Sequence, residues 1–347
     1  MPSLENARAV PGTADRKAEH LRIAAGDGVA HGRGTGLAAV RLRHRALPGR
    51  DLDAVDLGTT LLGARLDAPL VVSAMTGGSP EAEAVNHRLA RAAAERGIAL
   101  ALGSGRALLD DPRLLTTYRG AHRPPLLLAN LGAVQLIAPD GPDRAAALVE
   151  LLGADGLTVH LNPVQEAVQP EGQPRFAGAG EAIARVVERL APLPVVVKEV
   201  GFGLDAADVT ELVEAGVAAI DVAGAGGTNW ALVEGRRTPA AGAVAAGFAD
   251  WGVGTREAIA AAVRAGRGRP VIASGGVRDG VEAAKCLALG ATAVGFARPL
   301  LQAAQADRAG EALDVLVAQL RIATWAAGAP GAASLGTRHL APGDGAS

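Results

Sequence analysis

The fold is decided by the stretch Pro270–Leu300, PVIASGGVRDGVEAAKCLALGATAVGFARPL. It starts with a short apolar run, Pro270–Ala273, which is followed by a glycine-rich turn. A stretch of helical period, Gly280–Leu289, comes next and leads into a second apolar run, Ala293–Phe296. Both runs are continuous rather than alternating, which is typical of strands buried on both faces of a parallel sheet. The stretch therefore predicts one strand–helix–strand unit with parallel strands.

The same unit recurs along the chain from about residue 68. Six further apolar runs precede the quoted stretch: Pro69–Ala74, Ile98–Leu102, Pro125–Ala129, Gly156–His160, Pro194–Lys198 and Ala218–Val222. Helical periodicity follows nearly every run, over Glu81–Arg96, Asp143–Leu152, Gly180–Leu190, Ala206–Ala215, Thr255–Ala265 and Gly310–Trp325. After the second run, Asp110-Asp111-Pro112 interrupts the pattern, and we expect a short or late helix there.

Eight such units predict an α/β fold of the TIM (β/α)8 barrel type. A doubly wound sheet is the alternative, and it is disfavoured because no G-x-G-x-x-G opens a helix after the first strand. Residues 1–67 form an N-terminal extension with a basic cluster, and residues 68–327 form the barrel. The last segment, 328–347, is rich in Gly, Ala and Pro, and we expect a flexible tail.

Composition excludes several classes of protein. The chain has 347 residues, 49% of them hydrophobic, which argues against disorder and coiled coil. A net charge of −2 and a content of only 2% aromatic residues argue against nucleic-acid binding. The single cysteine, Cys286, excludes a disulfide framework within the chain and a Cys/His zinc cluster. The sequence has neither a signal-peptide pattern nor a long apolar run, so we expect a cytoplasmic protein without a membrane partner.

Polar residues follow every predicted strand, at the end where TIM barrels carry their active sites. The loops after the first three strands contain Thr76, then Ser104 and Arg106, then Asn130. The loops after the last five contain His160, Lys198, Thr228, Ser274 and Arg298. Because these strand ends meet at one mouth of the barrel, the sequence predicts a single convergent site.

Two of these features favour a phosphate-containing cofactor. Gly275 and Gly276 would let backbone N–H groups approach an anion, with Arg298 on the neighbouring strand end. Lys198 ends an apolar strand and is expected in the barrel mouth, as a Schiff-base lysine or as a cation beside an electron-rich cofactor ring. The structural alternatives are a simple tight turn for the glycines and a salt bridge with Glu199 or another carboxylate for the lysine.

The densest polar cluster is His160, Asn162, Gln165 and Glu166. A carboxylate such as Glu166 could ligate Mg²⁺ together with substrate phosphates. A second phosphate group could be held by Arg16, Lys17, His20 and Arg106. For Arg16 and Lys17 the alternative is a solvated charged helix face.

The ordered motifs RKAEH, AMTGG, GSGR, ANLG, HLNPVQEAVQPEG, VKEVGFG, GAGGTNW, FADWGVGT and SGGVRDG resemble those of type 2 isopentenyl-diphosphate isomerases, the FMN-dependent form. The likeness runs from residue 16 to about residue 300. Its most specific parts are the HLNPVQE…QPEG stretch and the tryptophans of GGTNW and DWG. The resemblance implies that isopentenyl diphosphate is isomerised to dimethylallyl diphosphate by reduced FMN acting as acid and base. It also implies Mg²⁺, priming of the flavin by NADPH, and a homotetramer or homo-octamer.

The resemblance also implies roles for individual residues. FMN would be held by Ala74, Met75, Thr76, Ser104, Asn130, Lys198, Thr228, Gly275, Gly276, Arg278, Ala297 and Arg298. The substrate diphosphate would be held by Arg16, Lys17, His20, Ser104 and Arg106. Gln165 would contact the carbon skeleton and Glu166 would bind Mg²⁺, while His160, Asn162 and Glu234 would complete the catalytic pocket. One position departs from the family pattern, because Gly105 stands where the family usually has glutamine.

Three other functions share parts of this pattern. An FMN-dependent 2-hydroxy-acid oxidase needs a His-Gly-x-Arg element after the sixth strand, where this chain has Gly226-Gly227-Thr228-Asn229. An enzyme resembling IMP dehydrogenase needs a cysteine nucleophile on a loop, whereas Cys286 lies in a helical run. A non-catalytic flavin- or phosphate-binding protein would need the glycine turns but not His160, Gln165 and Glu166 together.

Overall fold

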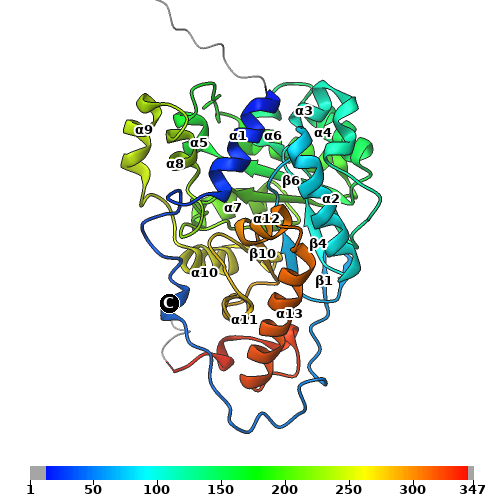
Figure 1. The fold of residues 1–347 in the computed structure, drawn as a ribbon, viewed down its shortest axis with the longest axis vertical. Coiled ribbons are helices and arrows are strands. Elements are labelled where there is room, and N and C mark those ends of the chain that lie inside the picture. Colours follow the sequence, from blue (N-terminus) through cyan, green and yellow to red (C-terminus); the bar gives the residue numbers. More distant parts are fainter. Residues whose placement is uncertain (1–12, 343–347) are drawn as a thin grey trace, which may run out of the picture.

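Eight parallel strands close into a barrel in the computed structural model, which describes residues 13–342 (Figure 1). Around the barrel the order is β10-β3-β4-β5-β6-β7-β8-β9. The strands are β3 (Leu70–Val72), β4 (Ala99–Ala101), β5 (Leu127–Gly132), β6 (Gly156–Leu161), β7 (Val195–Glu199), β8 (Ala219–Asp221), β9 (Val271–Ala273) and β10 (Ala293–Phe296). Each of the eight apolar runs contains or overlaps one of these strands, and closure of the sheet excludes a doubly wound fold. The prediction of a TIM barrel is confirmed.

The helices with strong periodicity lie where the sequence predicts them, to within two residues. They are α2 (Pro80–Glu95), α4 (Gly141–Leu152), α6 (Ala179–Leu190), α7 (Ala206–Glu214), α10 (Thr255–Ala265), α11 (Gly280–Ala288) and α13 (Ala309–Ala326). The interrupted segment forms the short α3 (Arg106–Asp110) and a 3-10 helix, η2 (Pro112–Thr117), which the Asp111 carboxylate caps. Further short 3-10 helices are η1 (Leu37–Ala39), η3 (Ala133–Gln135), η4 (Ala246–Phe248), η5 (Ala332–Ser334) and η6 (Thr337–His339).

Several short elements have no counterpart in the sequence prediction. They are α1 (Thr13–Ala25), α5 (Pro163–Val168), α8 (Trp230–Gly235), α9 (Pro239–Ala245), α12 (Arg298–Gln305) and the hairpin of β1 (Thr59–Leu61) and β2 (Ala64–Leu66). Most of these helices are too short for an apolar period to emerge, and local signals start them instead. Thr238 caps α9 with its side chain, and Pro239 follows at the first helical position. Asn229 caps α8 in the same way.

The interior of the barrel has an apolar layer below a polar one. In the apolar layer, Val71, Leu128, Val196, Ala219, Ile272 and Ala293 pack on Leu61 and Leu66 of the β1–β2 hairpin, which fills one end of the barrel. Two residues further along the strands, on the same face, come Ser73, Asn130, His160, Lys198, Asp221 and Ser274. We call these six residues the polar ring. The ring lies at the carboxyl ends of the strands and forms the floor of the site.

The N-terminal extension and the C-terminal segment both pack on the barrel. Helix α1 contacts α2, α8 and α12 and crosses the face of the molecule seen in Figure 1. Residues 328–342 are packed, which corrects the prediction of a flexible tail for the described part of 328–347. Leu340 is buried and bridges to Leu42, and Gly331 bridges to Asp56. The prediction was wrong because it rested on the high Gly, Ala and Pro content of the segment, whereas a few apolar residues anchor it.

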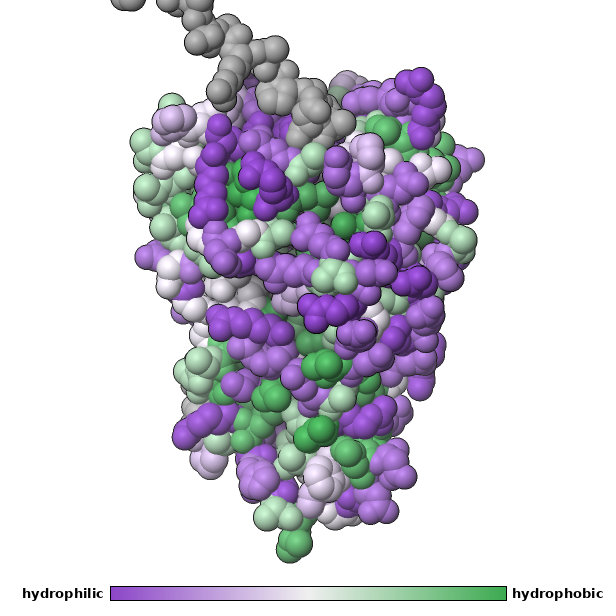
Figure 2. All heavy atoms as spheres, in the orientation of Figure 1, coloured by the Kyte–Doolittle hydropathy of each residue, from purple (hydrophilic) through white to green (hydrophobic). Residues whose placement is uncertain are grey.

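The surface in view is mixed in character. Apolar side chains lie scattered among polar ones (Figure 2). Within the part of the chain that the structure describes, no helix is both long and apolar enough to cross a membrane.

Cys286 is fully buried on α11, as its place in a helical run predicts, and burial raises the pKa of its thiol.

Candidate active site

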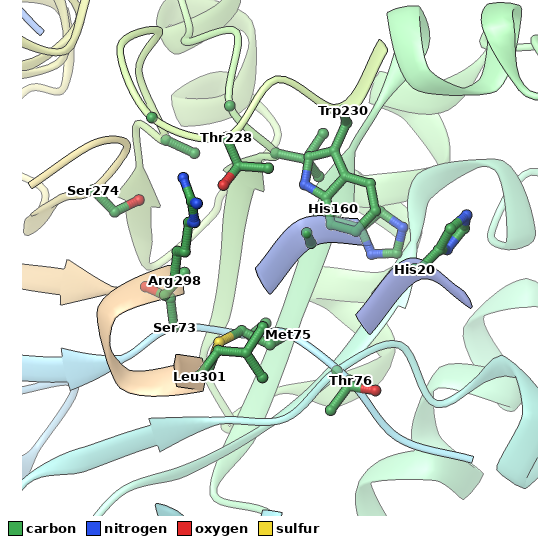
Figure 3. A pocket seen from close by; sticks show the side chains of 18 of the residues that line it. His20, Ser73, Met75, Thr76, His160, Thr228, Trp230, Ser274, Arg298 and Leu301 are labelled. Carbon is green, nitrogen blue, oxygen red and sulfur yellow. The ribbon is translucent and has the colours of Figure 1, made fainter. Parts of the chain in front are cut away.

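A cavity of about 660 Å³ opens at the carboxyl ends of the barrel strands, with α1 forming one wall (Figure 3). With one exception, the predicted site residues line it. They are Arg16, Lys17, His20, Ala74, Met75, Thr76, Ser104, Arg106, Asn130, His160, Asn162, Gln165, Glu166, Lys198, Thr228, Gly275, Gly276, Arg278, Ala297 and Arg298. The exception is Glu234, which lies behind the wall. The structure therefore brings the predicted residues to one place, as convergence of the strand ends requires.

Two glycine-rich loops stack against each other at one side of the cavity. Gly275 has φ +96°, and a Cβ there would lie 2.1 Å from the carbonyl oxygen of Gly224. A Cβ on Gly227 would lie 2.5 Å from the backbone nitrogen of Gly276. These positions require glycine because the two backbones touch, so the glycines do more than make a tight turn. The result is a cradle of exposed backbone on the cavity wall.

Arg298 lies beside this cradle at the first turn of α12 (Figure 3). Its Nη2 donates to the carbonyl oxygen of Gly26 at 2.6 Å and to the Asp27 carboxylate at 3.0 Å. Its Nε is buried without a hydrogen-bond partner. A buried guanidinium nitrogen without an acceptor is costly unless an anion completes its contacts. The cradle and Arg298 together suit a phosphate group.

Lys198 supplies a buried positive charge at the floor of the cavity. Its side chain is 7% exposed, and Nζ donates to the backbone carbonyl of Glu199. The Glu199 carboxylate instead accepts hydrogen bonds from the backbone N–H groups of Gly201 and Phe202. Burial raises the pKa of Glu199 to about 7. The expected alternative, a Lys198–Glu199 ion pair, is therefore not formed.

His160 is a neutral hydrogen-bonding group. Its Nδ1 lies 2.8 Å from the Asn130 Oδ1, an atom that can only accept, so Nδ1 carries the proton. Burial, with the nearby charges of Lys198 and Lys17, lowers the pKa of His160 to about 3. Nε2 is therefore left as an acceptor, and the ring does not serve as an acid at neutral pH.

The side chain of Gln165 is held from both sides. Its Oε1 accepts from Asn162 Nδ2 at 3.2 Å, and its Nε2 donates to Glu234 Oε1 at 2.9 Å. Glu234 is fully buried, and it also lies 3.0 Å from His20 Nε2. Burial would raise the pKa of Glu234, but hydrogen bonds from His20, Gln165 and Arg237 bring it below its usual value. Glu234 therefore stays ionised and positions Gln165, rather than lining the pocket as expected.

The sequence prediction missed Arg237, whose side chain is only 5% exposed. It pairs with Glu19 at 3.1 Å, Glu171 at 2.7 Å and Glu234 at 2.9 Å. These carboxylates come from α1, from the loop after α5 and from α8. The sequence around Arg237 does not predict these three ion pairs. Glu19 and Glu171 are distant along the chain, and the three-residue spacing from Glu234 is common on helices.

The α1 wall of the cavity is cationic. Lys17 Nζ donates to the Ser104 carbonyl at 3.0 Å and to the Tyr118 hydroxyl at 2.8 Å. Burial and the charges of Arg16 and Arg106 lower the pKa of Lys17 to about 7. His20 stands edge-on to Trp230, with ring centroids 5.5 Å apart (Figure 3). Because Arg16 and Lys17 line the cavity, the interpretation of this cluster as a solvated helix face is wrong.

A metal would find only part of its ligands in this chain. Among the described residues, no group of three or more His, Cys, Asp or Glu side chains could hold a metal ion. Glu166 lines the cavity, and its two oxygens accept from Asn162 Nδ2 at 3.1 Å and from the Gln173 N–H at 2.6 Å. The Asn162 Oδ1 is buried without a partner. These oxygens suit Mg²⁺ only if a ligand such as a phosphate supplies further oxygens.

Comparisons with known proteins identify relatives of this chain. The model of the FMN-dependent dehydrogenase family matches residues 13–108 and 180–342. Isopentenyl-diphosphate delta-isomerases are similar over most of the chain. The one from Stutzerimonas stutzeri is 49% identical over 88% of this chain and 90% of its own. Those from Xanthobacter autotrophicus and Rickettsia bellii are 48% and 39% identical, covering 92% and 88% of this chain and 94% and 91% of their own.

The chain belongs to the isopentenyl-diphosphate delta-isomerase family of enzymes. The resemblance of the sequence motifs to this family is thus confirmed. Solved structures show the fold alone. A mandelate oxidase variant with an FMN adduct is 21% identical with a TM-score of 0.61, covering 96% of this chain and 93% of its own. A flavocytochrome b2 variant with benzoylformate is 18% identical with a TM-score of 0.64, covering 95% and 80%.

The dehydrogenase model leaves residues 109–179 unmatched. This segment contains Asn130, His160, Asn162, Gln165 and Glu166. The isomerase relatives, by contrast, are similar over about nine-tenths of the chain. The cluster around Gln165 therefore lies in the part of the chain that the dehydrogenase model does not match.

Proposed function

We propose that the protein isomerises isopentenyl diphosphate to dimethylallyl diphosphate with reduced FMN as acid and base, with Mg²⁺, and with NADPH to reduce the flavin. The observation that carries the proposal is a single cavity with two unlike ends. One end combines the glycine cradle, Arg298 and Lys198. The other end is the cationic α1 wall with Gln165 beside it. The first suits a flavin phosphate and ring, and the second suits a diphosphate.

The residues present fit FMN. Gly275, Gly276 and the unpartnered Nε of Arg298 would hold its phosphate, and Lys198 would lie beside its ring system. Other proposed contacts are with Ala74, Met75, Thr76, Ser104, Asn130, Thr228, Arg278 and Ala297. Reduced FMN, when bound, supplies ring nitrogens that can give and take a proton at the alkene carbons. The buried Lys198 charge favours an anionic ring over a neutral one.

The chain's own residues bind and orient the substrate. Arg16, Lys17, His20, Arg106 and the Ser104 loop would hold the diphosphate, and their positive charges would offset its negative charge. Gln165 would lie along the carbon skeleton, fixed there by Glu234 and Asn162. His160 is neutral and accepts at Nε2. It would therefore orient a hydrogen-bond donor that lies next to it in the cavity.

Mg²⁺ would be held by Glu166, with the free Asn162 oxygen and the substrate diphosphate as further oxygen ligands. Its charge would offset that of the diphosphate. Because the protein offers so few ligands, the metal and the substrate would bind together. Metal affinity should therefore be weak in the absence of a diphosphate.

The proposed partner is a small isoprenoid diphosphate, and the proposed state is a cytoplasmic homotetramer or homo-octamer without nucleic-acid or membrane partners. The family of the chain supports the small-molecule partner. Light scattering coupled to gel filtration measures the oligomeric state. A monomer at micromolar concentration would contradict that part of the proposal.

A 2-hydroxy-acid oxidase is the alternative suggested by the solved structures with this fold. The loop after β8 has Gly226-Gly227-Thr228-Asn229 and so lacks the histidine and arginine of such enzymes. Asn229 is instead fully buried as the cap of α8. An enzyme resembling IMP dehydrogenase is also disfavoured. It needs a cysteine nucleophile, and Cys286 is fully buried on α11 and does not reach the cavity.

The test uses the purified protein. We expect a yellow preparation that releases FMN on denaturation, and isomerisation that requires reduced flavin and Mg²⁺ without stoichiometric use of NADPH or oxygen. A colourless protein that FMN cannot reconstitute would overturn the flavin assignment. Peroxide formed in proportion to the turnover of a 2-hydroxy acid would instead support the oxidase.

A further inference from the structure

The polar ring contains one carboxylate, Asp221, to which the proposed function gives no role. Asp221 is 5% exposed and does not line the cavity. Ser274 Oγ donates to its Oδ1 at 2.5 Å, and the Ala223 N–H donates to the same atom at 3.3 Å. A buried carboxylate is costly unless something nearby favours its charge. Its surroundings therefore decide what it does.

Lys198 is the charged neighbour of Asp221. The two residues are register partners on β7 and β8, and the parallel pairing directs both side chains to the barrel interior. His160 is the register partner of Lys198 on the other side, and it is neutral. Ser73, Asn130 and Ser274 carry no charge. Within the polar ring, one ammonium thus faces one carboxylate.

The other nearby carboxylate, Glu199, also experiences the Lys198 charge, but backbone groups hold it on another face of the strand. Glu199 follows Lys198 in sequence, so its side chain leaves the strand on the opposite face. There it accepts hydrogen bonds from the backbone of Gly201 and Phe202. Burial raises the pKa of Asp221, whereas Lys198 acts to lower it. Asp221 is therefore the carboxylate that shares the inner face of the barrel with Lys198, below the cavity floor.

We propose that Asp221 is a positioning residue that acts as the buried counter-ion of Lys198 and thereby sets how strongly the cavity floor attracts an anionic cofactor ring. The proposal rests on the proposed function, because it assumes that FMN lies against Lys198. Lys198 favours the reduced, anionic ring over the oxidised, neutral one. Asp221 weakens this preference for the anionic ring. The ring can then still change its charge as it gives a proton to the substrate and takes one back.

Asp221→Asn tests the charge with little change of shape. An asparagine Oδ1 still accepts from Ser274 and from the Ala223 N–H, but the negative charge is lost. The Lys198 charge is then uncompensated, so reduced FMN should gain affinity relative to oxidised FMN. We expect the ratio of the two dissociation constants to shift by about tenfold. For a two-electron couple, this moves the midpoint potential positive by about 30 mV.

A double-mutant cycle separates this role from a merely structural one. In Lys198→Met, Asp221 is left without its partner and takes up a proton, so adding Asp221→Asn should shift the potential no further. Ser274→Ala is the matched control, because it removes a hydrogen bond to Asp221 and leaves the charge. Its shift should be smaller than that of Asp221→Asn. Equal shifts from Asp221→Asn with and without Lys198, or a shift below twofold, would overturn the proposal.

A second measurement covers the case in which Asp221→Asn does not fold. Infrared spectra are recorded in a Glu199→Gln background, which removes the second buried carboxyl that Lys198 affects. In that background, Lys198→Met should raise the intensity of the protonated carboxyl band, and an unchanged band would also overturn the proposal. The readouts are flavin affinity, potential and carboxyl protonation. A wild-type protein that binds FMN but does not isomerise isopentenyl diphosphate would therefore remove the proposed function and leave this inference testable.

Discussion

Gln165 and Glu166 are adjacent in sequence but have different partners, and separate roles follow from this. Glu166→Gln removes a charged oxygen ligand and keeps the shape, so activity should need more Mg²⁺ and recover partly when it is added. Gln165→Ala removes a group that Glu234 and Asn162 hold in the cavity, where we propose that the reacting carbons lie. Loss of such a group should lower kcat by about 10²–10⁴ without rescue by Mg²⁺. Steady-state kinetics at several Mg²⁺ concentrations measure both.

The control for this pair is FMN content, which should be unchanged in both variants. If both respond alike to Mg²⁺, the division of roles is wrong. Near-normal turnover of Gln165→Ala would remove its catalytic role.

Lys17 gives the free enzyme a response to pH. Its pKa is lowered to about 7, so the side chain is fully charged only well below pH 7, is about half charged at pH 7, and loses its charge as the pH rises further. A bound diphosphate favours the charged form, so substrate binding near pH 8 should take up a proton. We expect KM to rise with pH above 7 in the wild type. In Lys17→Arg, whose guanidinium keeps its charge, the profile should be flatter.

Calorimetry in buffers of different ionisation enthalpy measures the proton uptake directly. Tyr118→Phe removes a hydroxyl that accepts from Lys17 at 2.8 Å, and it should raise KM while leaving kcat nearly unchanged. A KM that stays constant from pH 6 to pH 9 in the wild type would contradict the role given to Lys17.

At the residue scale, the sequence predicts members of the site better than their roles. The sequence predicts that residues near the strand ends belong to the site, because strand ends converge in a barrel. This applies to Lys198, Arg298 and Gln165. Arg237 and Asp221 were missed because their importance comes from partners on other elements. Glu234 was named through the resemblance, but its place behind Gln165 depends on how α8 packs on α5.

At the element scale, Gly105 lies where α3 and α4 pack closely against each other. A Cβ at Gly105 would lie 2.4 Å from Leu148 Cδ1 on α4, and its φ of −82° is ordinary, so the obstacle is space rather than backbone strain. Gly105→Gln, which introduces the residue usual in the family, should therefore destabilise the protein by about 1–3 kcal/mol. Adding Leu148→Ala should return part of that loss, as measured by chemical unfolding.

Gly34 provides the matched control, because a Cβ there meets nothing within 4 Å. Gly34→Gln should leave the free energy of unfolding nearly unchanged. If Gly105→Gln is equally harmless, then Leu148 does not fill the space. Leu148 otherwise occupies the space that a side chain at position 105 would need.

Elements with a long apolar period were predictable, and short ones were not. The strands and the helices such as α6 and α13 follow directly from periodicity. Helices α5, α8 and α12 span only six to eight residues each, too few for a period to be distinguished from a loop. They nevertheless carry Gln165, Glu234 and Arg298. The least predictable elements thus hold part of the site.

At the scale of the whole molecule, the C-terminal segment 329–342 packs against residues 41–56 rather than beside the cavity. It contributes the buried side chains of Leu335 and Leu340, and none of its residues lines the cavity. A chain that ends at Gly328 loses the burial of both leucines, at least about 3 kcal/mol. We therefore expect the Tm to fall by roughly 5–10 °C. FMN affinity at low temperature should be unchanged.

Thermal unfolding followed by fluorescence, together with flavin titration, measures the two effects separately. Leu340→Ala should give part of the loss in Tm, because Leu340 is 3% exposed. Leu47→Ala is its matched control, because Leu47 is 82% exposed and should give no loss. A truncated chain with the wild-type Tm would mean that this packing adds no stability. A truncated chain that loses FMN affinity at low temperature would mean that the segment supports the barrel mouth from a distance.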